Sequence, residues 1–292
     1  MEIVIAKNTG LCYGVKRALH LAQKTRRQTT EKVFTLGDLI HNHQVIAELK
    51  RQGIDSIENP DDLMEGTVII RSHGVSPHIY KRLSRKKIKI VDATCPIVKK
   101  IQKLVEELAQ KKLEVIIVGN KEHPEIRGLI GYSLGKGLII ENETQADALP
   151  FKKKRAVLAQ STQDPFLFKK VVATLIERTA ELKVYNTICR STQTRQQATS
   201  DLASKVQALF IVGGKNSSNT YQLYQISKRI LPNTYFIESA EQIRPRMLRG
   251  AKKIGISGGA STPPEAIQEA VQKIKKCSEP PSQREYHIQC PR

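Results

Sequence analysis

The sequence lacks several features that mark familiar classes of protein. It has no run of about 18 apolar residues, which excludes a membrane-spanning helix. The apolar segment near the amino terminus is too short for a signal-peptide core, so we expect a cytoplasmic protein. It has no tryptophan, and only 5% of its residues are aromatic. It also has no Walker A or G-x-G-x-x-G sequence, so no motif indicates ATP or NAD.

Apolar and basic residues are abundant. Of the 292 residues, 39% are hydrophobic and 26% are charged, which is enough apolar material for a packed core and argues against disorder. The length suggests roughly two domains. The net charge of +20 predicts an anionic partner: nucleic acid, an acidic protein or a phosphorylated substrate. Without a secretory signal, the five cysteines do not indicate a disulfide scaffold, so they are buried apolar residues or ligands.

Three segments of the chain resemble one another. In each, a short apolar strand signal runs into a cysteine, Cys12, Cys95 or Cys189, and a stretch of helical periodicity follows, over residues 15–24, 97–110 and about 195–208. Two further families of strand-end motifs recur at nearly the same spacing. This agreement predicts three repeats of about 90 residues.

Each repeat alternates strand and helix signals, which is typical of parallel sheets with flanking helices. We therefore expect an α/β fold of three repeated domains: residues 14–95, residues 96–188, and residues 1–13 together with 189–276. The polar, proline-containing segment 277–292 is predicted to be a disordered tail, with Cys277 and Cys290 as solvated thiols.

The polar residues that stand out lie where strands end and helices begin. In open parallel sheets, ligands bind beyond the carboxyl ends of the strands. If the three repeats meet around a pseudo-threefold axis, these junctions converge on one central site. The junction residues are Cys12, His41, His73, Cys95, His123, Glu125, Ser161, Cys189, Ser217, Asn219 and Ser261.

Three convergent thiolates suit a metal site. A helix N-terminus favours the thiolate, which is the ligand form of cysteine. The chain has no C-x₂₋₄-C pair of the kind zinc prefers, although zinc can still take three cysteines and a histidine. An iron–sulfur cube usually takes four cysteines, so a cube held by three has one iron free to act on substrate as a Lewis acid. Both alternatives stay open on the residues alone.

The other junction residues point to an anionic substrate. His41, His73 and His123 can donate to phosphate oxygens. The hydroxyl- and glycine-rich helix starts at residues 215–219 and 258–264 present backbone N–H groups to an anion. Glu125 suits a buried general acid whose pKa rises near an anionic ligand, with Ser161 or Thr162 as a proton relay.

Taken together, these motifs closely resemble the family of 4-hydroxy-3-methylbut-2-enyl diphosphate reductases, which act last in the methylerythritol phosphate route to isoprenoids. The resemblance covers residues 1 to about 275. The matching strings are Gly10-Leu-Cys12-Tyr-Gly-Val, Ile40-His41-Asn42, Ser72-His73-Gly74-Val, Asp92-Ala-Thr-Cys95-Pro, His123-Pro-Glu125, Gln160-Ser161-Thr162, Asn186-Thr-Ile-Cys189, Thr194-Arg-Gln196, Gly214-Lys-Asn-Ser-Ser-Asn219 and Gly259-Ala-Ser-Thr-Pro263.

The resemblance implies a trefoil of three α/β domains around one 4Fe–4S cluster. Cys12, Cys95 and Cys189 would hold three irons, and the fourth would bind the substrate's allylic hydroxyl. Glu125 would be the proton donor, and Ser161 stands where the family usually has threonine. The reaction would be a two-electron, two-proton dehydroxylation that yields isopentenyl and dimethylallyl diphosphates. Residues expected to bind the substrate are His41, His73, His123, Ser161, Ser217, Ser218, Asn219 and Ser261.

The resemblance further implies a ferredoxin- or flavodoxin-type electron donor, and the high positive charge suggests a basic face that docks it. Two other classes compete with this reading. A nucleic-acid binder would explain the charge, but no RRM, OB or zinc-ribbon pattern appears. A zinc hydrolase would use the three cysteines and a histidine, and its colourless protein would differ from a brown iron–sulfur protein.

Overall fold

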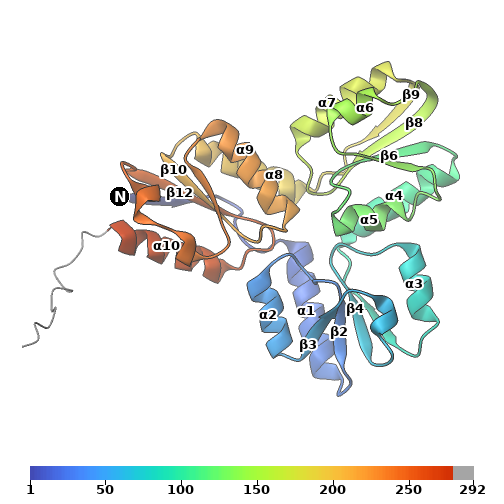
Figure 1. Cartoon of the computed structure of the whole chain (residues 1–292), viewed down its shortest axis with the longest axis horizontal. Helices are drawn as coiled ribbons and strands as arrows, with labels where there is room; N and C mark the ends of the chain where they lie inside the picture. The colour runs from blue at the N-terminus through green and yellow to red at the C-terminus, as the bar shows by residue number, and fades with distance from the viewer. Residues whose placement is uncertain (279–292) are drawn as a thin grey trace, which may run out of the picture.

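Three four-stranded parallel sheets form three lobes around a common centre (Figure 1). The structure is a computed structural model and describes residues 1–278. Each sheet carries helices and buries apolar side chains on both faces, which is why its central strands are continuous apolar runs rather than alternating ones. The α/β fold class predicted from the repeat is therefore confirmed.

The first lobe has the strand order β3-β2-β4-β5. The central strand β4 is buried at every position, because helices cover both of its faces. Its strands are β2 (Val33–Leu36), β3 (Ile54–Ile57), β4 (Thr67–Ile70) and β5 (Lys89–Asp92). Its helices are α1 (Tyr13–Gln28), α2 (His43–Arg51), α3 (Pro77–Ser84) and the 3₁₀ turn η1 (Pro60–Asp62).

The second lobe has the equivalent order β7-β6-β8-β9. Its strands are β6 (Glu114–Val118), β7 (Gly137–Ile140), β8 (Lys152–Ala159) and β9 (Thr179–Tyr185). Its helices are α4 (Pro96–Gln110), α5 (Pro124–Ile130), α6 (Glu143–Asp147) and α7 (Pro165–Glu177).

The third lobe takes its edge strand from the opposite end of the chain. Strand β1 (Glu2–Ile5) pairs in parallel with β12, and Ile3 lies opposite Ile254. The order is β1-β12-β10-β11, so β1, β5 and β9 occupy the same edge position in their sheets. The other strands are β10 (Ala208–Val212), β11 (Thr234–Ile237) and β12 (Lys253–Gly258). The helices are α8 (Arg190–Ala203), α9 (Ser218–Ile230), α10 (Pro264–Ser278), η2 (Ala240–Gln242) and η3 (Pro245–Leu248).

The three sheets fall within the domain bounds expected from the repeat, although those bounds themselves stay a prediction. Two local expectations differ from the structure. Helix α8 begins at Arg190 rather than near residue 195, because its first turn is polar and gives no apolar periodicity to read. Helix α10 continues through Ser278, so Cys277 is a helical residue, half-buried against the core of the third lobe. Residues 279–292, with Cys290, lie outside the described part.

Within residues 1–278, no helix combines the length and the apolar composition needed to cross a bilayer.

Candidate active site

A cavity of about 110 Å³ lies where the carboxyl ends of the three sheets meet. Its lining contains every residue that the sequence analysis assigned to the site, drawn from all three repeats. These residues are Cys12, His41, His73, Cys95, His123, Glu125, Ser161, Cys189, Ser217, Ser218, Asn219 and Ser261.

Each of the three cysteines stands at the N-cap of a helix, α1, α4 or α8. None of their side chains makes the usual capping hydrogen bond, so the sulfur atoms are not used to end these helices. Their backbone N–H groups bind equivalent loops at the ends of neighbouring strands. The bonds run from Cys12 to the Ala260 carbonyl (3.0 Å), from Cys95 to that of Ser72 (2.9 Å) and from Cys189 to that of Ser161 (2.8 Å).

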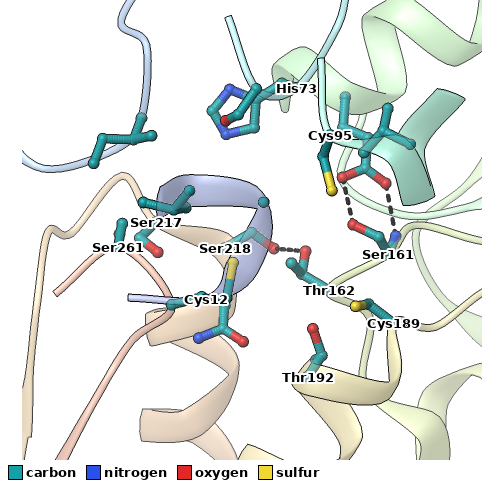
Figure 2. A pocket seen from close by; sticks show the side chains of 18 of the residues that line it. Cys12, His73, Cys95, Ser161, Thr162, Cys189, Thr192, Ser217, Ser218 and Ser261 are labelled. Carbon is teal, nitrogen blue, oxygen red and sulfur yellow. Dashed lines mark hydrogen bonds between the residues drawn. The ribbon is translucent and has the colours of Figure 1, made fainter. Parts of the chain in front are cut away.

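The sulfur atoms converge. A Cβ atom at Gly14 would lie 2.6 Å from the Sγ of Cys95 and 4.0 Å from the Sγ of Cys12. Figure 2 shows the sulfur of Cys189 turned toward the same open space. Burial raises the pKa of the Cys95 thiol, and the nearby Cys12 and Cys189 raise it further. Three half-buried thiols that line one cavity fit a thiolate-ligated metal group, whose binding releases their protons.

Glu125 is the buried acid of the cavity. The residue is 2% exposed, and its carboxylate accepts two hydrogen bonds from Ser161, from the backbone N–H to Oε1 (2.7 Å) and from the hydroxyl to Oε2 (2.6 Å). Figure 2 shows both bonds as dashed lines from Ser161. Burial raises the pKa of Glu125, and the two Ser161 bonds oppose that rise. The carboxyl group thus has an environment in which both protonation states are accessible.

Three imidazole rings form a second cluster. The ring centroids of His41 and His73 are 4.4 Å apart, and His123 lies 5.4 Å from the first and 5.3 Å from the second. Burial lowers the pKa of all three, most clearly at His73, and takes that of His123 to about 3. At neutral pH the cluster is therefore uncharged, and each ring has one N–H donor.

The tautomer of His123 follows from its role as a helix cap. Its Nδ1 accepts the backbone N–H of Glu125 at 3.2 Å, at the start of α5. A neutral imidazole that accepts at Nδ1 carries its proton on Nε2. One ligand atom of each ring lies within 4.8 Å of the others, a spacing that suits either a divalent cation or an acceptor-rich anion.

Several buried polar atoms around the imidazoles have no hydrogen-bond partner among the described residues. They include His41 Nε2, His73 Nδ1 and both amide atoms of Asn219. Leaving such groups unpaired costs about 1–3 kcal/mol each, so a ligand that pairs them gains that energy back. Ser217 beside them caps α9 and accepts from the backbone N–H of Thr220 at 3.3 Å.

Hydrogen bonds across the cavity join the repeats. The Ser261 hydroxyl donates to the His41 carbonyl at 3.0 Å, which links the third repeat to the first. The Thr162 hydroxyl donates to that of Ser218 at 2.9 Å, which links the second repeat to the third (Figure 2). The site is consequently assembled only when all three lobes are in place.

Sequence reasoning did not assign a role to two arginines near the site. Arg195 is 3% exposed and donates to the carbonyls of Asn8 and Gly10, so it fixes the loop that carries Cys12 against α8, which begins after Cys189. The sequence could have pointed to Arg195, because this residue lies six positions after Cys189 and belongs to the Thr194-Arg-Gln196 string. Arg71 lines an adjoining cavity of about 850 Å³ that also contacts His41 and His123, and its charge helps to lower their pKa values.

Known proteins are similar to this chain in sequence. The model of the LytB protein family matches residues 3–275. The 4-hydroxy-3-methylbut-2-enyl diphosphate reductase of Caldanaerobacter subterraneus subsp. tengcongensis is 42% identical over 279 residues, which are 94% of this chain and 97% of the relative.

Two solved structures are also similar. One, of (E)-4-hydroxy-3-methyl-but-2-enyl diphosphate reductase, the terminal enzyme of the non-mevalonate pathway, is 42% identical with a TM-score of 0.68 and covers 94% of this chain and 100% of its own. The other, the E-1-hydroxy-2-methyl-but-2-enyl-4-diphosphate reductase from Plasmodium falciparum, is 26% identical with a TM-score of 0.90 and covers 96% of this chain and 89% of its own. The chain therefore belongs to the LytB protein family.

Proposed function

We propose that this chain reduces (E)-4-hydroxy-3-methylbut-2-enyl diphosphate to isopentenyl and dimethylallyl diphosphates, as its relatives' names indicate. The chain is an oxidoreductase of the non-mevalonate isoprenoid pathway. The observation that carries the proposal is a single cavity in which three thiols, a buried acid and an uncharged imidazole cluster face one another. The reaction consumes two electrons and two protons and releases the hydroxyl group as water.

The cysteine trio is assigned to the cofactor. Enzymes of this family are iron–sulfur proteins, and we assign Cys12, Cys95 and Cys189 as ligands of one 4Fe–4S cluster per chain with one iron not ligated by protein. When bound, such a cluster supplies electrons singly and a Lewis-acidic iron. Within residues 1–278 the one other cysteine, Cys277, packs in the third lobe's core, which supports a three-cysteine ligand set.

The diphosphate end of the substrate occupies the imidazole side of the cavity. The uncharged rings and the buried amide offer N–H donors that have no hydrogen-bond partner among the described residues. The hydroxyl groups can exchange their present partners for a ligand. Diphosphate oxygens accept such bonds, and the anion in turn favours protonation of the rings. The residues assigned to this end are His41, His73, His123, Ser217, Ser218, Asn219 and Ser261. Ser161 is also assigned to substrate binding, on the Glu125 side of the cavity.

Glu125 delivers a proton to the leaving hydroxyl group. Hydroxide is a poor leaving group, so the C–O bond breaks more readily as water forms. Burial raises the pKa of Glu125 and so favours its protonated form, and the Ser161 hydroxyl, 2.6 Å from Oε2, can pass the proton onward. After transfer, the two Ser161 donors stabilise the carboxylate.

The two electrons come from outside the chain. We assign the donor as a ferredoxin- or flavodoxin-type protein, as the resemblance to the reductase family implies.

An anaerobic assay tests the function directly. Reconstituted protein is mixed with the synthetic diphosphate substrate and reduced methyl viologen, and products are separated by chromatography. The proposal predicts consumption of viologen electrons in a two-to-one ratio to products, and loss of both cluster and activity in Cys95→Ser. A brown, iron-loaded protein that leaves the diphosphate unchanged would contradict it.

A further inference from the structure

A groove on the surface reaches one of the cluster cysteines without passing the imidazole side of the cavity. It has a volume of about 260 Å³ and lies between the start of α4 and the segment that leads into α8. We call it the Cys189 groove, formed mainly by Ile97, Lys100, Ile101, Leu104, Cys189 and Arg190. Cys189 and Ile97 also line the central cavity, so one thin wall separates the groove from the assigned cluster site.

The groove has an apolar floor and a basic rim. Ile101 is buried, Leu104 is half-buried and Ile97 is 37% exposed, whereas Lys100 and Arg190 are exposed. No carboxylate lines the groove within residues 1–278. This pattern, apolar at the centre and charged at the edge, is typical of protein–protein contacts.

The two rim cations are not neutralised by a nearby carboxylate. Lys99, next to Lys100, pairs with Asp92 at 2.7 Å, but among the described residues neither Lys100 nor Arg190 lies within 4.0 Å of a carboxylate. Both cations also lie near helix N-termini, and the first turns of α4 and α8 contain no acid. Arg190 is the first residue of α8, where the helix dipole disfavours a cation, so its charge does not stabilise that helix.

An electron must enter through some part of this surface. The inference rests on the proposed function, in which each turnover takes two electrons singly from a separate carrier. Each electron leaves the reduced carrier, which becomes oxidised, and two such transfers with two protons convert the substrate into product and water. The central cavity contains the substrate-binding imidazoles beside the cluster cysteines, whereas the Cys189 groove is lined by a cluster cysteine without them.

We propose that the Cys189 groove is the docking surface for an acidic one-electron carrier protein. The net charge of +20 attracts such a carrier over a distance, and the unpaired rim cations orient it over Cys189. The small groove suits the weak, short-lived contacts of electron-transfer pairs, which bury less than about 1,200 Å².

The test uses the holoenzyme with Lys100→Glu and Arg190→Gln combined. Turnover is measured at low ionic strength with two electron sources, reduced plant-type ferredoxin and reduced methyl viologen. The matched control combines Lys111→Glu and Lys205→Gln, which changes the net charge equally at the other ends of α4 and α8, roughly 20 Å away.

The expected result is a rise of about tenfold in the KM for ferredoxin in the groove variant alone, while its viologen-driven turnover and iron content match the wild type. Wild-type turnover with ferredoxin should also fall as salt is added. The proposal is overturned if the groove variant keeps the wild-type KM for ferredoxin, or if the control variant loses as much. Absence of viologen-driven turnover in the wild type would instead contradict the proposed function.

Discussion

At the scale of single residues, the site depends on groups whose proton affinity is set by burial. Glu125 is held by two bonds from Ser161 in a water-poor setting, and His123 is fixed in one tautomer by capping the helix that presents Glu125. The acid and the imidazole are therefore positioned by the same turn of α5. Small changes at this turn affect both proton delivery and anion binding.

Glu125→Gln removes the acid but keeps an acceptor for the Ser161 N–H. We expect unchanged cluster content and substrate affinity, and a kcat lowered by about 10²–10⁴, the usual contribution of a positioned general acid. The control is Glu122→Gln, an exposed acid three positions earlier that pairs with Arg127 on the surface. Steady-state kinetics with methyl viologen distinguish the two, and a Glu125→Gln enzyme with near-normal kcat would remove the proton-donor assignment.

The uncharged imidazoles make stability depend on pH. The pKa of His73 is lowered by burial, so below about pH 6.5 the unfolded chain takes up a proton at this position and the folded chain does not. Stability without substrate therefore falls on acidification, by about 1.4 kcal/mol per pH unit for each such histidine. The raised pKa of Glu125 has the opposite effect on stability, but Glu125 is present in both the wild type and the His73→Gln variant, so its effect cancels when the two are compared.

His73→Gln should lose less stability than the wild type between pH 7 and about 5.5. Glutamine does not titrate, so the unfolded variant takes up no proton at this position. Urea unfolding under anaerobic conditions at several pH values measures the difference. Parallel pH profiles for the two proteins would show that His73 is protonated in the folded state.

At the scale of secondary-structure elements, the same unit is used three times. An edge strand ends, a cysteine follows, and a helix of the next lobe begins directly after it. The cysteines are thus placed by the crossings between lobes, and their sulfur atoms lie at the positive ends of α1, α4 and α8.

Gly14 in the first turn of α1 is the closest test of this packing. An added methyl group would meet Cys95 Sγ at 2.6 Å, so we expect Gly14→Ala to lower iron and sulfide content sharply. Gly128→Ala in α5 is the matched control, because its Cβ would meet only ordinary contacts at 3.6 Å. Metal analysis and thermal unfolding of both variants provide the measurement, and equal iron content in the two would show that the sulfur atoms are not constrained at Gly14.

Much of this arrangement was readable from the sequence, since strand ends, helix starts and repeated cysteines are local signals. What could not be read depends on contacts between distant segments. Arg195 reaches the carbonyls of Asn8 and Gly10 across nearly the whole chain, and no local pattern encodes that partner. The polar first turn of α8 gave no periodicity to read. The Cys189 groove forms because α4 lies beside a segment that is distant from it in the sequence, around Cys189.

At the scale of the whole molecule, the chain closes on itself. Strand β1 completes the third sheet (Figure 1). Bonds such as Ser261 to the His41 carbonyl and Thr162 to Ser218 tie neighbouring lobes at the cavity. The ligands assigned to the cluster are contributed by the crossings between the lobes. Assembly of the metal site and assembly of the three lobes are therefore coupled, and we expect the protein without its cluster to be less stable.

The most direct test of the central assignment is the metal content of anaerobically purified protein, combined with its Mössbauer spectrum before and after addition of substrate. Three cysteine ligands predict about four iron and four acid-labile sulfide per chain, with one iron whose signal differs and changes when substrate binds. Zinc in place of iron, or four equivalent irons that substrate leaves unaltered, would contradict the account.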